Sequence, residues 1–320
     1  MTTVVSMLLQ DTGKFRTNGK DQFYTQEAVA KTCIDRVLAL LPYTSEYLWV
    51  EPSAGNGSFL NQLPFQKIGL DIDPKSDTIV KQDYLTWTPP SQPCIVFGNP
   101  PFGKQSSLAR AFISKSCGFA NVIAFILPKS FTKPSMYKAF HMNFHLVHSE
   151  ELAKDSFVLN GLPYDVPCIF QVWQKRDIER PLEEKILPLG FQYVKETLDY
   201  HIALRRVGGN AGKCYKSGTH FNVQCHYFIR FDTTLHLDRM IEKINHHIFP
   251  SNTVGPRSLS KAEVNVVLNE IILLVQSSTL VQSSASTSVQ PSASISVQPL
   301  ASTSVQPSAL EPDATKPTEA

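Results

Sequence analysis

The apolar run Cys94–Gly98, followed at once by Asn99-Pro100-Pro101-Phe102, constrains the fold of this chain more than any other stretch. The run is too short for a helix and is closed by Gly and Pro, so it predicts a buried strand. Each Pro fixes its own φ and favours extended geometry in the residue before it. The chain should therefore leave the strand as a stiff turn, with the Asn amide and the Phe ring at the strand's carboxyl end. In open α/β sheets that end binds ligands.

The turn itself has two interpretations. The amide oxygen of Asn99 and the carbonyl of Pro100 can together accept both hydrogens of an exocyclic amino group, and the ring of Phe102 can stack on the base that carries it. The alternative is a strand-ending Pro turn with a buried Phe. The turn alone does not decide between them.

Size and composition limit the class of protein. With 320 residues and a net charge of +2, the chain should form one large domain, or one and a half, with accessory segments. No run has the length of a membrane helix and the N-terminus lacks a signal-peptide pattern, so we expect no membrane partner and a cytoplasmic or nuclear protein. The six cysteines include no Cys-x-x-Cys pair, which favours reduced thiols and argues against a metal site.

The two ends of the chain differ from the middle. Residues 1–19 are interpreted as an N-terminal extension. From residue 276 to 320 the sequence is mostly Ser, Ala, Thr, Val, Gln and Pro, with Val-Gln-Pro repeated every eight residues from Val289. Such a segment cannot bury enough apolar area to offset its ordering entropy, so it is expected to be disordered.

A Gly-rich turn follows the first predicted strand. Phe23-Tyr24-Thr25 leads into an amphipathic helix over residues 26–41, then comes a strand over residues 47–51. Gly55 and Gly57 would let the backbone approach a ligand, with a helix beyond them. Only Gly-x-Gly remains of the dinucleotide fingerprint, and Glu51 would repel phosphates. A carboxylate there suits an amino group or a sulfonium-bearing ligand.

Two further acids end the next strands. Asp71 closes the strand over residues 67–71, where a carboxylate accepts hydrogen bonds from ribose hydroxyls. Asp73 is the next candidate, although it can simply cap the turn. Asp83 follows a third short strand and could reach an adenine amino group, with Tyr84 packing beside it.

The order of these motifs resembles that of the S-adenosylmethionine-dependent amino-methyltransferases, most closely the adenine-N6 methyltransferases of DNA and RNA with gamma-class motif order. The resemblance covers about residues 21–175. It implies an α/β fold of the class I methyltransferase (Rossmann-like) type over residues 20–176: a mostly parallel seven-stranded sheet with helices on both faces.

The resemblance also implies roles. It makes S-adenosylmethionine the cofactor and places it against Tyr24, Thr25, Glu51, Ala54, Gly55, Gly57, Asp71, Ile72, Asp83, Tyr84 and Asn99. Glu51, Ala54 and Gly55 would line its methionine end, Gly57 would shape the turn, and Ile72 would lie against its adenine ring. Asn99, Pro100 and Phe102 would hold and stack the target base, with Pro101 beside them.

A second wall of the substrate pocket is predicted after the strand over residues 121–127. Lys129 and Phe131 follow it. The alternative is a solvated charge and a core ring.

Residues 177–275 are interpreted as a small appended subdomain with a closing helix over residues 259–274. Residues 201–230 hold five cations, no acid, and several aromatics. Cations beside aromatics suit nucleic-acid binding, so Arg205, Arg206 and Lys213 are predicted to contact the substrate. The alternative is a solvated sheet face.

The expected activity is methylation of the N6 amine of adenine in DNA or RNA. Because the turn serves any planar amine, guanine N2 and protein glutamine remain alternatives. A third possibility is a non-catalytic binding module that has kept the fold.

Overall fold

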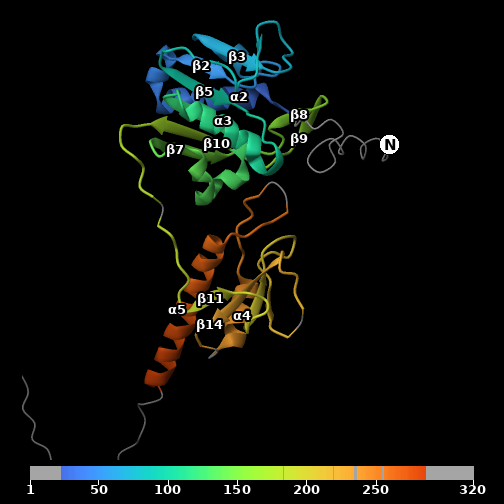
Figure 1. The fold of residues 1–320 in the computed structure, drawn as a ribbon, viewed down its shortest axis with the longest axis vertical. Coiled ribbons are helices and arrows are strands. Elements are labelled where there is room, and N and C mark those ends of the chain that lie inside the picture. Colours follow the sequence, from blue (N-terminus) through green and yellow to red (C-terminus); the bar gives the residue numbers. More distant parts are fainter. Residues whose placement is uncertain (1–22, 183, 219, 234–235, 254–255, 286–320) are drawn as a thin grey trace, which may run out of the picture. The chain divides into compact units, whose positions relative to one another are not determined.

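The structure is a computed structural model that describes residues 23–182, 184–218, 220–233, 236–253 and 256–285 (Figure 1). The chain divides into two units, residues 1–275 and residues 276–320. The predicted extension over residues 1–19 and the repeats from Val289 onward lie outside the described residues.

The first part is built on a seven-stranded sheet with the order β4-β3-β2-β5-β6-β10-β7. Numbered along the chain, this order is 3-2-1-4-5-7-6, which shares its first five strands with the Rossmann order 3-2-1-4-5-6. Strands β2 to β6 pair in parallel, whereas β10 is antiparallel to both β6 and β7. The predicted mostly parallel seven-stranded sheet is therefore confirmed. The strands are β2 (Leu48–Glu51), β3 (Lys67–Asp71), β4 (Val80–Lys81), β5 (Cys94–Gly98), β6 (Val122–Pro128), β7 (Phe144–Glu151) and β10 (Cys168–Lys175).

Helices cover both faces of this sheet, as expected. The helix α2 (Glu27–Leu40) packs through Cys33 and Val37 beside Trp49 and Phe97 on one face. The helix α3 (Ser107–Cys117) lies on the other side of the sheet (Figure 1). On that face the short helices η6 (Lys129–Thr132) and η7 (Pro134–Ala139) also pack. Phe140, which follows η7, stacks its ring on that of Trp173 with the centroids 4.0 Å apart.

The segment after the Gly-rich turn departs from the expectation. It forms one 3-10 turn, η4 (Leu60–Gln62), and not the predicted α-helix. Pro64 follows within one turn and cannot supply a backbone N–H to a continuing helix. Short 3-10 segments also connect α2 to β2 and β5 to α3, over η3 (Pro42–Glu46) and η5 (Lys104–Ser106).

A small three-stranded sheet stands beside the main one. It has the order β1-β8-β9, formed by β1 (Tyr24–Thr25), β8 (Phe157–Leu159) and β9 (Leu162–Tyr164). All its pairs are antiparallel. The sheet therefore fixes the lead-in to α2 against a hairpin that comes more than a hundred residues later.

The C-terminal subdomain has its own four-stranded antiparallel sheet with the order β11-β14-β12-β13. Its elements are β11 (Phe191–Val194), β12 (Ile202–Arg205), β13 (Cys214–Lys216), β14 (His226–Phe231), α4 (Leu237–His246) and α5 (Lys261–Ala285). Within the basic region of residues 201–230, β12 pairs with β14 antiparallel. A separate hydrophobic core lies between this sheet and its helices.

Contacts and a helix cross two of the predicted boundaries. Arg180 donates hydrogen bonds to carbonyls of residues 137–144, so the first part of the molecule extends at least four residues past residue 176. The closing helix α5 continues to Ala285, ten residues into the segment expected to be disordered. No Pro or Gly interrupts the sequence between residue 261 and Pro291, so nothing stops the helix earlier.

Within the described residues, no helix is both long and apolar enough to cross a membrane.

Candidate functional site

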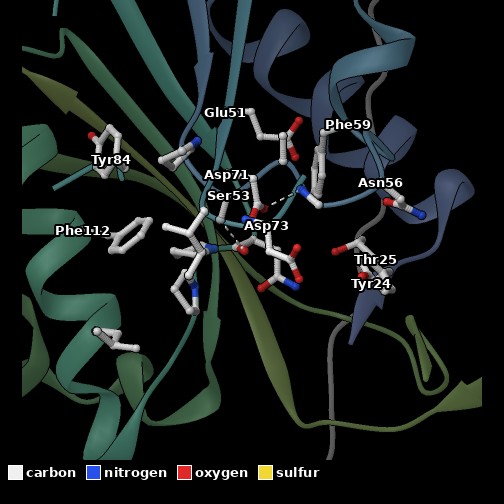
Figure 2. Close-up of a pocket in the computed structure, with 18 of the residues that line it drawn as sticks. Tyr24, Thr25, Glu51, Ser53, Asn56, Phe59, Asp71, Asp73, Tyr84 and Phe112 are labelled. Carbon is white, nitrogen blue, oxygen red and sulfur yellow. Dashed lines mark hydrogen bonds between the residues drawn. The ribbon is translucent and has the colours of Figure 1, made fainter. Parts of the chain in front are cut away.

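A cavity of about 370 Å³ opens at the carboxyl ends of β2, β3 and β5 (Figure 2). Its volume lies within the range of small-molecule sites. It brings together thirteen of the predicted site residues from separate parts of the sequence. They are Tyr24, Thr25, Glu51, Ala54, Gly55, Asp71, Ile72, Asp83, Tyr84, Asn99, Pro100, Pro101 and Phe102.

The Gly-rich turn needs its glycines for two local reasons. Gly55 has φ +53°, and a Cβ there would lie 2.9 Å from Cε1 of Tyr24. Gly57 has φ +83°, and a Cβ there would lie 2.8 Å from Nδ2 of Asn61. Backbones with such φ favour glycine. Gly57 is not among the cavity-lining residues, so its contribution is the shape of the turn.

Asp71 ties the turn to the end of β3. Its Oδ2 accepts the backbone N–H of Gly55 at 2.8 Å, and its Oδ1 accepts that of Asp73 at 2.8 Å. Figure 2 shows the Asp71 and Asp73 side chains together in the cavity. Each carboxylate oxygen has a second lone pair, so Asp71 can still accept from ribose hydroxyls. The neighbouring Ile72 lines the cavity and is 60% exposed.

Glu51 lies beneath the turn and is only 2% exposed. Its Oε2 accepts the backbone N–H of Leu60 at 3.0 Å. Burial raises the pKa of the Glu51 carboxyl well above its usual range, against the Leu60 hydrogen bond, and the nearby charge of Asp71 raises it further. A cation bound in the cavity would favour ionisation of this carboxyl. Gly98 has φ +118°, and a Cβ there would lie 3.1 Å from Cγ of Glu51, a tight contact.

Asp83 and Tyr84 differ in their exposure to solvent. Asp83 is exposed, lines the cavity, and accepts the Leu85 N–H through Oδ1 at 2.9 Å. Tyr84 is 1% exposed, and its hydroxyl shares a 2.7 Å hydrogen bond with Ser116 of α3. Burial raises the pKa of Tyr84. Tyr84 is therefore chiefly a core residue that supports the loop, and only its edge borders the cavity.

The Asn99 corner faces this turn. The Ser53 hydroxyl donates to the Asn99 carbonyl at 3.0 Å and so joins the Gly-rich turn to the Asn-Pro-Pro-Phe turn (Figure 2). Oδ1 of Asn99 is buried and, within the described residues, has no hydrogen-bond partner; the same is true of Oγ1 of Thr25. Folded proteins pair nearly all buried polar atoms. These two unpaired oxygens therefore mark where a ligand would contribute donors.

Phe102 lines the cavity but is largely buried. It is 8% exposed, and the ring of Phe23 lies edge-on to it with centroids 5.6 Å apart. Phe23 is itself held by Phe157 and Tyr164, at 5.0 and 6.2 Å. In this conformation Phe23 therefore covers much of the Phe102 ring, and its stacking on a base stays a prediction. Its remaining exposed part faces the cavity.

Several predicted residues lie away from the cavity. Phe131 is fully buried, so its predicted place in a substrate wall is wrong and the core alternative holds. Lys129 does not line the cavity and pairs with Glu151 at 2.7 Å. The three cations predicted to contact the substrate lie on or beside the sheet of the C-terminal subdomain. They are Arg205, Arg206 and Lys213, which donate to the carbonyls of Val207, Gln224 and Asn245.

The sequence interpretation also missed lining residues. Besides Phe23 and Asp73, which it noted without assigning them to the site, these are Pro52, Ser53, Asn56, Ser58, Phe59, Leu85, Leu108 and Phe112. Five of these could have been indicated by their position in the Gly-rich turn: Pro52, Ser53, Asn56, Ser58 and Phe59. Leu108 and Phe112 read as an inward helix face, and no local signal separates a cavity-facing residue from a core one.

Among the Asp, Glu, Lys, Arg and His residues, the cavity lining includes only acids. It includes Glu51, Asp71, Asp73 and Asp83 but no Lys, Arg or His among the described residues. Such a lining disfavours phosphate groups and favours a ligand with hydroxyls, amines or a cationic centre. In the described part of the chain no cluster of three or more His, Cys, Asp or Glu could hold a metal ion.

Comparisons with known proteins give only distant likenesses. No protein-family model and no curated protein matches the sequence. A candidate RNA methyltransferase of Pyrococcus horikoshii is similar in structure, at 16% identity over 54% of this chain and 97% of that one, with a TM-score of 0.40. The 23S rRNA methyltransferase ErmE is 16% identical over 50% of this chain and 72% of its own, with a TM-score of 0.36.

A dimethyladenosine transferase from Plasmodium falciparum is 12% identical over 49% of this chain and 64% of its own, with a TM-score of 0.34. Likenesses this weak do not assign an activity.

Proposed function

We propose that this protein is an S-adenosylmethionine-dependent methyltransferase that acts on the exocyclic N6 amine of adenine in DNA or RNA. The observation that carries the proposal is the unpaired, buried Oδ1 of Asn99, which borders the same cavity as the Gly55–Asp71 turn. An acceptor for an amine and a turn suited to a nucleoside ligand therefore share one enclosed space.

The cofactor fits the donor set of the cavity. Acids without cations exclude a pyrophosphate-bearing dinucleotide and suit a sulfonium, an α-amino group, ribose hydroxyls and an adenine amine. Asp71 would accept from the ribose, Asp83 from the adenine amine, and Thr25 Oγ1 would pair with the amino-acid end. Glu51, buried and without a cationic partner among the described residues, would lie nearest the positive charge. The cofactor supplies an electrophilic methyl group.

The chain's own contribution to the reaction is to position the amine. The lone pair of an aromatic amine is delocalised into the ring, so the nitrogen is a weak nucleophile. Oδ1 of Asn99 and the carbonyl of Pro100 would accept its two hydrogens, favour a more tetrahedral nitrogen and aim its lone pair at the methyl carbon. On transfer, the amine nitrogen held by these two acceptors would exchange one hydrogen for the methyl group, and the proton released would pass to solvent. This is catalysis by orientation and electrostatics, without a general base.

Nucleic acid is the favoured acceptor because of the C-terminal subdomain. Arg206 lies over the Tyr227 ring, with Cζ 5.2 Å from the centroid, and Arg205 and Lys213 are close to it in sequence. We propose that these cations contact the phosphates of the substrate. The structure tempers the basic character inferred from the sequence, since Lys216 pairs with Asp238 and His220 with Glu196.

The test is transfer of tritiated methyl to mixed DNA, RNA and protein, followed by nucleoside mass spectrometry. Label in N6-methyladenosine or its deoxy form supports the proposal. Label in N2-methylguanosine or in a protein glutamine would move the activity to another planar amine. Absence of cofactor binding in isothermal titration would indicate a non-catalytic module.

A further inference from the structure

The corner that carries the amine acceptors, residues 99–101, is barely tethered through its own backbone. Pro100 and Pro101 have no backbone N–H, so the corner holds a single amide donor. The pairing of β5 with β6 ends at Gly98, and the next backbone hydrogen bond along the chain joins Phe102 to α3. Within the described residues, the one hydrogen bond to the backbone of the corner comes from a side chain, the hydroxyl of Ser53.

Ser53 is itself held by the Gly-rich turn. Its hydroxyl lies 3.0 Å from the carbonyl oxygen of Asn99 (Figure 2). The two residues after it are fastened to β3. The N–H of Ala54 donates to a carbonyl of β3 at 2.9 Å, and the N–H of Gly55 donates to Asp71 at 2.8 Å. The hydroxyl therefore reaches the corner from a turn that is anchored to another strand of the sheet.

We propose that Ser53 is a positioning residue whose hydroxyl sets the orientation of the Asn99–Pro100 peptide, and with it the two acceptors for the target amine. This inference rests on the proposed function. A peptide unit is planar, so a hydrogen bond to its carbonyl fixes the tilt of the whole unit. The side chain of Asn99 leaves the chain just before this peptide, and the carbonyl of Pro100 follows just after it. A change in the tilt would move the two acceptor oxygens relative to each other.

This role differs in its consequences from that of a hydrogen bond that only stabilises the fold. A bond that orients the acceptors affects the exocyclic amine and not the rest of the base. It also leaves the contacts to the cofactor in place. We therefore expect that loss of the Ser53 hydroxyl slows transfer and weakens recognition of the amine, while cofactor affinity is retained.

The experiment compares Ser53→Ala with the wild type, both full-length, on the oligonucleotide that the wild type methylates best. Single-turnover transfer should slow by about three- to tenfold, the effect of losing one neutral hydrogen bond, and cofactor affinity in isothermal titration should change by less than about twofold. Ser53→Thr retains a hydroxyl and should keep more of the rate than Ser53→Ala. Ser45→Ala is the matched control, because Ser45 also donates to a backbone carbonyl, that of Pro42 at 3.0 Å, but lies outside the cavity lining.

Recognition of the amine gives a second readout that does not depend on transfer. Oligonucleotides carry at the target position either adenine or purine, which lacks the exocyclic amine, and their affinities are measured in the presence of S-adenosylhomocysteine. The affinity ratio of adenine to purine should be about threefold or more higher for the wild type than for Ser53→Ala. Because the cost of freeing each base is the same for both proteins, it cancels in this comparison.

Four results would each overturn the role of Ser53 while the proposed function stands. They are an unchanged rate in Ser53→Ala, a rate loss explained by weaker cofactor binding, an unchanged affinity ratio, and equal losses in Ser53→Thr and Ser53→Ala. The proposed function is tested first, on oligonucleotides of RNA and DNA that place adenine in every nearest-neighbour context, paired and unpaired. If the wild type methylates none of them, the proposed function fails and the role of Ser53 fails with it.

Discussion

Replacing Asn99 with Ala should separate catalysis from stability, because Asn99 holds a buried acceptor with no partner in the described residues. An unpaired buried polar group destabilises a fold by about 1–3 kcal/mol. Its removal should therefore leave the free energy of unfolding unchanged or raise it by up to about 1 kcal/mol, after the loss of packing around the side chain. Transfer should fall by about 10²–10³-fold, the usual effect of removing one hydrogen-bonding group that acts on the reacting atoms.

Three measurements check this Asn99 prediction. Single-turnover transfer gives the rate of the chemical step, isothermal titration gives cofactor affinity, and urea unfolding gives stability. Asn99→Asp keeps an oxygen acceptor and should retain more transfer than Asn99→Ala. A folded Asn99→Ala protein that binds cofactor much more weakly, or that unfolds with a loss above about 2 kcal/mol, would refute the assignment of the side chain to the target amine.

Two other changes test the turn at the cavity, and a third tests the fold that carries it. Gly55→Ala should destabilise the fold by about 1–2 kcal/mol in urea unfolding and weaken cofactor binding. The reason is that φ at this position is left-handed and that the new Cβ would meet Tyr24. Unchanged cofactor binding would contradict this prediction. The variant Glu51→Gln tests the buried carboxyl. In the wild type, burial raises the folded-state pKa of Glu51 above its unfolded value, so the fold favours the protonated form. Wild-type stability relative to Glu51→Gln should thus be greatest below about pH 4 and fall as pH rises, and a pH-independent difference in urea midpoints would count against it. Arg180→Ala should destabilise the fold by about 2–4 kcal/mol, since Arg180 donates to four carbonyls and lies over Trp173. Arg180→Lys should recover only part of the lost stability. An unchanged denaturant midpoint in Arg180→Ala would argue against this role of Arg180.

The parts of the site that could be predicted from sequence are those fixed by strand ends. In a parallel sheet the carboxyl ends of neighbouring strands meet at one edge, so Glu51, Asp71 and Asn99 had to converge once their strands were identified. The positive φ values of Gly55 and Gly57 follow from the turn between β2 and β3. These residues depend on local geometry and a simple topology.

The rest depends on contacts between distant segments. The turn alone leaves open whether the Phe102 ring is presented or buried. Phe23 covers it because β1 pairs with β8, which lies more than a hundred residues away. Asn160-Gly161 is a strong hairpin signal, but nothing local says that its partner strand is β1. Whether Phe131 faces a pocket or the core is likewise decided by packing, which hydrophobic periodicity does not specify.

The cavity is best understood as two half-sites that share their supports. Ser53 of the Gly-rich turn holds the carbonyl of Asn99, and Glu51 occupies the space that a side chain at Gly98 would need. Asp71 fixes Gly55 from the next strand. A displacement of the cofactor turn would therefore move the backbone that carries the amine acceptor. For this reason we expect substitutions in the turn to affect transfer more than cofactor affinity alone would explain, whereas the Asn99 side chain, which supports nothing else among the described residues, should affect transfer only.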